Sequence, residues 1–131
     1  MAYSKLHIKA ETTSDHINNV MYMEYLEKAR KVWYQFCLSH DVRAMVVNIN
    51  ADYKREMFDQ ERLTIHTETE RVGRTSFTLK QTIINEENEL VLSANAVLAV
   101  VDRQTKAKTH VPQAIRELVA KKEPLQPLMT N

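Results

Sequence analysis

Apolar residues recur at three- and four-residue spacings along one stretch of the chain, from about Val20 to Leu38. This spacing predicts an amphipathic α-helix of about 18 residues, roughly 27 Å long, with charged residues such as Arg30 at the remaining positions. Asn18 or Asn19 is suited to cap the helix, because an amide side chain can accept a bond from a free N–H of the first turn. The apolar face comprises Tyr22, Leu26, Ala29, Trp33 and Phe36.

Before and after this helix the pattern alternates with a period of two, which is typical of β-strands. The strand Glu89–Asp102 is apolar at consecutive positions, so we expect it to be central and buried on both faces. Pro112 opens a second, modest helix over Gln113–Lys122, and the chain from about Glu123 is expected to be a flexible tail. The other expected strands are Lys5–Ala10, Met45–Tyr53, Glu61–Arg71 and Arg74–Asn85, with a short one at Lys106–Val111.

One strand, one helix and then four or five mostly antiparallel strands favour a helix wrapped by a curved sheet. The 131 residues are enough for one domain and too few for two, and they contain no internal repeat or linker. We therefore predict a single α+β domain over residues 1–131, with about five strands in the sheet. A cone-shaped α+β fold is the alternative, but such folds usually begin with two or more helices.

Composition narrows the possible functions. The 18 basic and 17 acidic residues nearly cancel, which argues against a nucleic-acid partner, and no apolar run approaches the roughly 20 residues of a membrane span. Gly73 is the only glycine, so no glycine-rich phosphate loop exists. The single cysteine, Cys37, and five histidines without metal-ligand spacing predict no metal and no cofactor, and they fit a reducing cytoplasm.

A polar turn containing Thr12, Asp15 and His16 leads into the predicted helix. Its side chains favour turns and caps, so local backbone bonding alone could explain Asp15. However, the first N–H groups of a helix have no intrahelical partners, and the helix dipole favours negative charge there. A titratable turn beside such a helix start is therefore a candidate site for chemistry on an anionic intermediate.

The segments His16–Tyr22 (HINNVMY) and Tyr25–Arg30 (YLEKAR) resemble the H-V-N-N-x-x-Y and Y-x-E-x-A-R motifs of the hotdog-fold thioesterases in the 4-hydroxybenzoyl-CoA thioesterase-like group. Similar family sequences also fall at Ala51–Arg55, Arg71–Ser76 and Val101–Asp102, so the resemblance covers about residues 4–120. It implies a hotdog fold, a homodimer or homotetramer, and hydrolysis of an acyl-CoA or acyl-carrier-protein thioester to free acid and thiol.

One position departs from the family. The family usually has a catalytic aspartate four residues before the position of His16, where this chain has Thr12. A threonine hydroxyl is not a general base at neutral pH. We expect Asp15 to act as the base or to orient His16, His16 to act as an acid/base or electrostatic group, and Thr12 to position water or substrate.

The resemblance also implies substrate-binding residues. Asn19 and Tyr22 match pocket positions, and Glu27 matches the family's helix glutamate. Arg55 and Arg74 could hold coenzyme A phosphates by charge. Core packing is the alternative role for Tyr22, and solvated strand ends are the alternative for the arginines.

Two functions follow from these residues. The first is an acyl-CoA thioesterase that uses the Thr12–His16 turn. The alternative is a hotdog protein that binds an acyl thioester or fatty acid without hydrolysing it, because of Thr12. A hotdog dehydratase or hydratase lacks support, since we find no separate His/Asp pair for that chemistry. An exposed sheet edge and a very apolar helix further predict a homo-oligomer formed by edge pairing.

Overall fold

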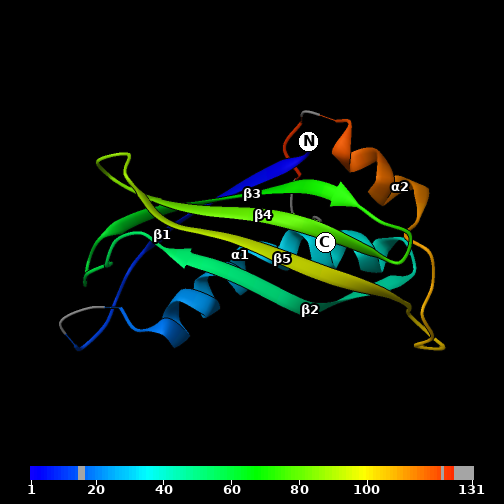
Figure 1. The fold of residues 1–131 in the computed structure, drawn as a ribbon, viewed down its shortest axis with the longest axis horizontal. Helices are drawn as coiled ribbons and strands as arrows, with labels where there is room; N and C mark the ends of the chain where they lie inside the picture. The colour runs from blue at the N-terminus through cyan, green and yellow to red at the C-terminus, as the bar shows by residue number, and fades with distance from the viewer. Residues whose placement is uncertain (15–16, 122, 126–131) are drawn as a thin grey trace, which may run out of the picture.

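The computed structural model describes residues 1–14, 17–121 and 123–125. Its five strands form one antiparallel sheet in the order β1-β3-β4-β5-β2, and α1 lies along one face of that sheet (Figure 1). The predicted α+β architecture, a curved five-stranded antiparallel sheet packed on a helix, is confirmed. The elements are β1 (Tyr3–Lys9), α1 (Asn19–Ser39), β2 (Val42–Tyr53), β3 (Arg62–Val72), β4 (Ser76–Asn85), β5 (Leu90–Asp102), α2 (Gln113–Arg116) and the 3-10 helix η1 (Glu117–Val119).

The start of α1 is fixed by Asn18, whose side-chain oxygen accepts a hydrogen bond from the Met21 N–H at 3.1 Å. The helix has 21 residues and ends at His40, whose N–H bonds to the Cys37 carbonyl at 2.9 Å. At 1.5 Å per residue, α1 is about 31 Å long and spans most of the sheet. The predicted helix and its asparagine cap are therefore confirmed.

The face of α1 toward the sheet forms the core in two halves. In the half near the start of α1, Tyr22 and Leu26 pack with Ala94 of β5 and Ile65 of β3. In the other half, Trp33 packs with residues of β4 and β5. Ala94 is 2% exposed, and its small side chain lets the helix approach the sheet closely.

A polar network joins α1 to the sheet inside this core. The pattern assigned Arg30 to the charged face of the helix, and this was wrong, because Arg30 is only 3% exposed. Its Nη1 donates to Gln81 Oε1 at 2.9 Å and its Nε donates to the Tyr34 hydroxyl at 3.0 Å. Gln81 Nε2 in turn donates to the Leu26 carbonyl at 3.0 Å and to Thr67 Oγ1 at 3.1 Å. These bonds compensate the loss of water around buried polar groups.

The prediction that β5 is buried on both faces was wrong for a single chain. Its inward residues are buried, whereas Val97 and Ala99 on the outward face are half-buried and Asn95 is exposed. The reason is that α1 covers only one face of the sheet.

The C-terminal part of the chain differs from the prediction in detail. Residues 106–111 make only an isolated bridge, between Lys108 and Val101, instead of a strand. The second helix is shorter than predicted: α2 and then η1 together place Ile115 and Leu118 in the core. Beyond them, the Leu125 N–H donates to the Tyr3 carbonyl at 2.7 Å. Lys122 and residues 126–131 lie outside the described residues.

Candidate active site

A pocket of about 540 Å³ lies at the start of α1. It is formed by the beginning of the helix, the end of β2 and the segment that follows β2. Its lining combines aromatic rings, an amide, two cations and one carboxylate, a composition typical of a small-molecule site. The lining residues are Ile17, Asn19, Tyr22, Tyr53, Lys54, Arg55 and Glu56.

Tyr22 is both a core residue and part of this pocket. Its ring is 6% exposed, and its hydroxyl accepts a hydrogen bond from the Met57 N–H at 3.1 Å and donates to the Arg55 carbonyl at 3.5 Å. Burial raises the pKa of Tyr22 above its ordinary value of 10.0, so the hydroxyl stays neutral. Tyr22 therefore ties the segment after β2 to the helix.

Tyr53 is a pocket residue that the sequence did not single out. Its hydroxyl donates to Asn19 Oδ1, and its ring meets the Tyr22 ring edge to face with 5.1 Å between centroids. Its side chain remains about half exposed. The sequence does show that Tyr53 ends a predicted strand and lies on the same face of it as Ala51. It does not show that this end of the strand lies beside Asn19.

The Thr12 turn is held by a neighbouring carboxylate. The Thr12 N–H donates to Asp59 Oδ1 at 2.8 Å, and the Ser14 N–H donates to Thr12 Oγ1 at 3.2 Å. The bond from Thr12 holds the pKa of Asp59 below its usual value. Thr12 Oγ1 thus already has a turn-forming role, which was one of the two roles that the sequence allowed for this segment.

Asp15 and His16, the predicted titratable pair, lie outside the described residues. The next residue, Ile17, is 2% exposed and donates its N–H to the Met57 carbonyl at 2.9 Å. Ile17 also lines the pocket. The chain therefore enters α1 directly beside the pocket wall.

The remaining predicted residues separate into two groups. Asn19, Tyr22 and Arg55 meet in the pocket, where Arg55 Nη2 also pairs with Glu89 Oε2 at 2.8 Å. Glu27 is exposed, two turns further along α1.

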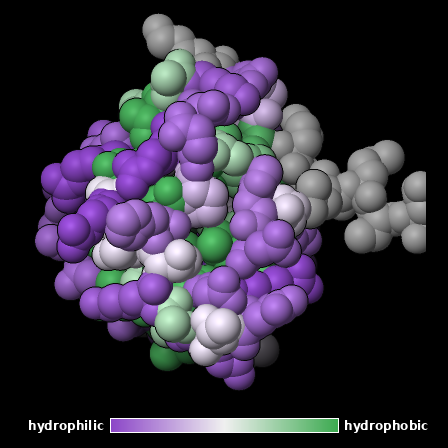
Figure 2. Space-filling view, turned by 90° about the vertical axis from the view of Figure 1, so that its right-hand side faces the viewer, coloured by the Kyte–Doolittle hydropathy of each residue, from purple (hydrophilic) through white to green (hydrophobic). Residues whose placement is uncertain are grey.

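Arg74 lies in the turn between β3 and β4, at the end of the molecule far from the start of α1. Figure 2 views that end, whose surface is mainly hydrophilic. The ten residues of β4 alone span about 30 Å, so Arg74 does not reach the pocket of its own chain.

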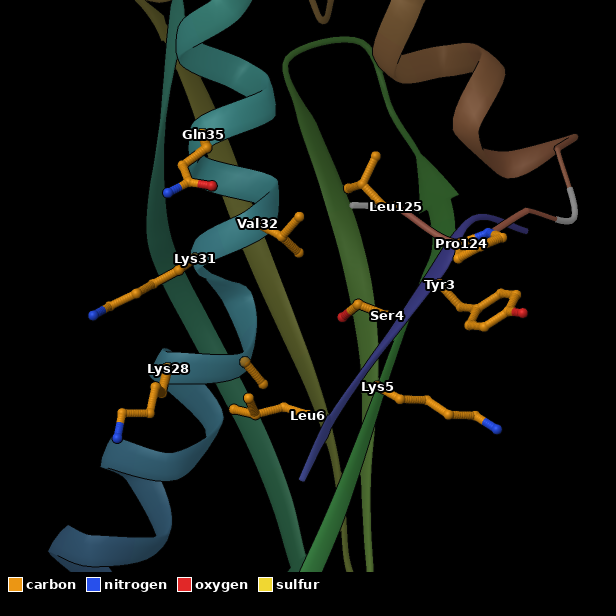
Figure 3. A pocket seen from close by; sticks show the side chains of 11 residues that line it. Tyr3, Ser4, Lys5, Leu6, Lys28, Lys31, Val32, Gln35, Pro124 and Leu125 are labelled. Atoms are coloured by element: carbon orange, nitrogen blue, oxygen red, sulfur yellow. The ribbon is translucent and has the colours of Figure 1, made fainter. Parts of the chain in front are cut away.

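A second hollow of about 450 Å³ runs between α1 and the edge strand β1 (Figure 3). Leu6, Val32 and Leu125 are turned into it, whereas Lys28 and Lys31 are directed away. Among its described lining residues there is no aspartate, glutamate or histidine that could act as a base. Hydrolytic chemistry is therefore better served by the pocket at the start of α1.

The described residues contain no cluster of three or more potential ligands that could hold a metal ion. No helix within residues 1–14, 17–121 and 123–125 is long and apolar enough to cross a membrane.

One helix packed along a curved five-stranded antiparallel sheet is the hotdog fold. The structure of this protein is similar to that of YbaW, a probable thioesterase from Escherichia coli, with a TM-score of 0.76 and 28% identity over 88% of this chain and 96% of that one. A predicted thioesterase from Bacillus stearothermophilus has the same fold, with a TM-score of 0.79, 21% identity, and 89% and 94% of the two chains covered.

The sequence identifies the family. Residues 15–92 match the Thioesterase superfamily. Over 111 residues the chain is 31% identical to the long-chain acyl-CoA thioesterase FadM of Escherichia coli (strain K12), covering 78% of this chain and 83% of that protein. This chain belongs to the thioesterase superfamily, and it is a thioester hydrolase.

Proposed function

We propose that this protein hydrolyses acyl-CoA thioesters to the free acid and coenzyme A in the pocket at the start of α1. The observation that carries the proposal is the 31% identity, across most of both chains, to a relative named for long-chain acyl-CoA thioesters. The pocket supports it, because aromatic and polar groups there converge on a helix start. Non-hydrolytic binding, the alternative raised by Thr12, is not favoured, since membership of a hydrolase family argues for turnover.

The start of α1 supplies donors for the oxyanion that forms when water attacks the thioester carbonyl. Asn18 accepts bonds from the N–H groups of Met21 and Tyr22. The N–H groups of Asn19 and Val20 have no hydrogen-bond partner among the described residues. Preorganised backbone donors of this kind lower the barrier to acyl transfer by a few kcal/mol, roughly 10²–10³-fold in rate.

The turn before α1 supplies the titratable groups in this proposal. His16 acts as an acid/base or electrostatic group, and Asp15 orients it or accepts a proton. Support comes from the motif His16–Tyr22 and from Ile17, which lines the pocket immediately after His16. Thr12 holds the turn through its bond from Ser14, while its hydroxyl proton stays available to position water.

Positive charge at the pocket mouth suits the phosphates of coenzyme A. Lys54 and Arg55 both line the pocket. The pair between Arg55 and Glu89 is largely exposed, with the two side chains 57% and 32% accessible. Such a pair contributes between 0 and about 1 kcal/mol, so a phosphate can compete for Arg55. Arg74 serves the same purpose only if another copy of the chain brings it near.

A homo-oligomer formed by pairing of β2 edges is part of this proposal. β2 is an edge strand that bonds to β5 on one side. Met45, Val46 and Val47 along it are 48%, 38% and 58% exposed. Contiguous exposed apolar residues on a sheet edge favour pairing with a second copy, which would remove them from water.

A thiol-release assay tests the function. The wild-type chain is assayed with short, long and aromatic acyl-CoAs and with an acyl-carrier-protein thioester, beside His16→Ala. We expect turnover of at least one acyl-CoA and a marked loss in the variant. Saturable binding without thiol release would instead support the non-hydrolytic alternative, and turnover of the carrier-protein thioester alone would change the substrate assigned.

A further inference from the structure

Glu56 is the only carboxylate among the described residues that line the pocket at the start of α1. It lies in the segment after β2, and its side chain is exposed. Glu56 forms no hydrogen bond or ion pair with any other described residue. Its carboxylate is therefore available to a molecule in the pocket.

The backbone on both sides of Glu56 is held firmly. The Tyr22 hydroxyl contacts both neighbours of Glu56, the Arg55 carbonyl at 3.5 Å and the Met57 N–H at 3.1 Å. The Met57 carbonyl accepts the Ile17 N–H, so the same segment is tied to the chain entering α1. The backbone thus holds Glu56 at the pocket edge, and its exposed side chain has no partner among the described residues.

Three carboxylates near this segment, Asp59, Glu61 and Glu89, already have hydrogen-bond or ion-pair partners. Asp59 accepts bonds from the Thr12 N–H and from Gln60, and it does not line the pocket. Glu61 accepts the Phe58 N–H at 2.8 Å, and Glu89 pairs with Arg55. Thr12 stands where the resemblance places the family's aspartate, and Glu56 is the carboxylate that the described pocket lining offers in its place.

We propose that Glu56 is the general base that activates water for thioester hydrolysis, a role that rests on the function proposed above. The carboxylate takes one proton as the water oxygen bonds to the carbonyl carbon, and the carbonyl π pair moves to the oxygen at the start of α1. When the carbonyl re-forms, the C–S bond breaks with its electron pair on sulfur. The proton passes from Glu56 to that thiolate, giving free acid and thiol.

Tyr22 is the positioning residue in this arrangement, because its hydroxyl holds the peptide units on both sides of Glu56. Without that hydroxyl the ring still fills the core, but the segment is free to shift. A misplaced base lowers the catalytic rate more than it weakens substrate binding.

Glu56→Gln tests the proposal, with Glu70→Gln as a matched control, since Glu70 is an exposed residue of β3 outside the pocket. We expect kcat to fall about 10²–10⁴-fold in Glu56→Gln, with KM changed only a few-fold. Glu70→Gln should behave as wild type. Tyr22→Phe should lower kcat less, and adding it to Glu56→Gln should have little further effect.

Three outcomes would overturn the proposal, and they can be told apart. An active wild type with Glu56→Gln within about three-fold of it would remove Glu56 from catalysis and leave the thioesterase function standing. A large loss in Asp15→Asn with none in Glu56→Gln would assign the base to Asp15. A wild type that releases no thiol from any acyl-CoA would overturn the proposed function itself, and the role of Glu56 with it.

Discussion

Gln81 is the centre of the polar network that fixes α1 on the sheet, and its replacement by leucine is the most informative test of the fold. Gln81 is 0% exposed and takes part in three hydrogen bonds, with Arg30, Leu26 and Thr67. Gln81→Leu removes all three while roughly keeping the volume. It also leaves the Arg30 guanidinium buried without its amide acceptor.

The cost can be worked from these contacts. A bond to a charged group contributes about 1.5–3 kcal/mol, and each of the two neutral bonds about 0.5–1.5 kcal/mol. Burial of the leucine methyl groups returns part of this, so we expect a net loss of about 2–4 kcal/mol in the free energy of unfolding. That is a large share of the 5–15 kcal/mol typical of a domain.

Urea unfolding at a fixed protein concentration measures this loss. Trp33 is the only tryptophan and is 1% exposed, so its fluorescence reports directly on the core. With a typical urea m-value, Gln81→Leu should lower the midpoint by about 1–2 M. Gln35→Leu, at an exposed position of α1, is the control and should change the free energy by no more than about 0.5 kcal/mol.

A double variant distinguishes the cost of the lost hydrogen bonds from the cost of leaving the buried Arg30 guanidinium without an acceptor. Replacing both partners, Arg30→Met with Gln81→Leu, should be less destabilising than Gln81→Leu alone, because no buried charge is then left without its acceptor. A loss below about 1 kcal/mol in Gln81→Leu, or a double variant less stable than that single variant, would show that this network does not stabilise the packing of α1 on the sheet.

Three further predictions concern single features. Burial raises the pKa of Cys37 to about 12, so iodoacetamide at pH 8 should leave the folded protein unlabelled and label it in urea; rapid labelling of the native protein would contradict the burial. The hydrogen bond from the Thr12 N–H lowers the pKa of Asp59 in the folded protein. The stabilisation of the turn by this bond is therefore complete above the ordinary pKa of about 3.9, and it is lost as the pH falls through the lower pKa of the folded protein. The Thr12 amide resonance should titrate below pH 3.9 and stop titrating in Asp59→Asn; a midpoint at or above 3.9 would count against this. Val47→Lys should reduce the sedimenting mass to that of the monomer, because it places a charge on the exposed β2 edge. Phe58→Lys, also at an exposed apolar residue, is the control and should leave the mass unchanged. An unchanged oligomer in Val47→Lys would exclude the β2 edge as the interface between copies.

The sequence predicted those parts of the fold that depend on local pattern. Asn18 followed by regularly spaced apolar residues was enough to locate α1, because the capping residue and the helical spacing both lie within one continuous segment. Arg30 was misassigned because its partner Gln81 lies 51 residues away, and the period of a helix does not reveal a long-range hydrogen bond. The burial of the outward face of β5 was predicted wrongly, because a run of apolar residues in the sequence does not show that one helix covers only one face of the sheet.

The same limit applies to the site. The motif residues Asn19 and Tyr22 were identified and do line the pocket. Tyr53 and Glu56 were missed, because the end of β2 meets the start of α1 only through tertiary contacts such as the bond between Tyr22 and Met57, 35 residues apart. The departure at Thr12 was visible in the sequence, but the carboxylate that would compensate for it needed the structure.

The proposed function is tested most directly by the steady-state rate of thiol release from a long-chain acyl-CoA, measured for the wild-type protein, Glu56→Gln and Glu70→Gln. We expect saturable turnover by the wild type and Glu70→Gln, and a loss of about 10²-fold or more in kcat for Glu56→Gln. No thiol release by the wild type from any acyl-CoA, with the protein folded and the acyl-CoA bound, would contradict the proposed thioesterase function.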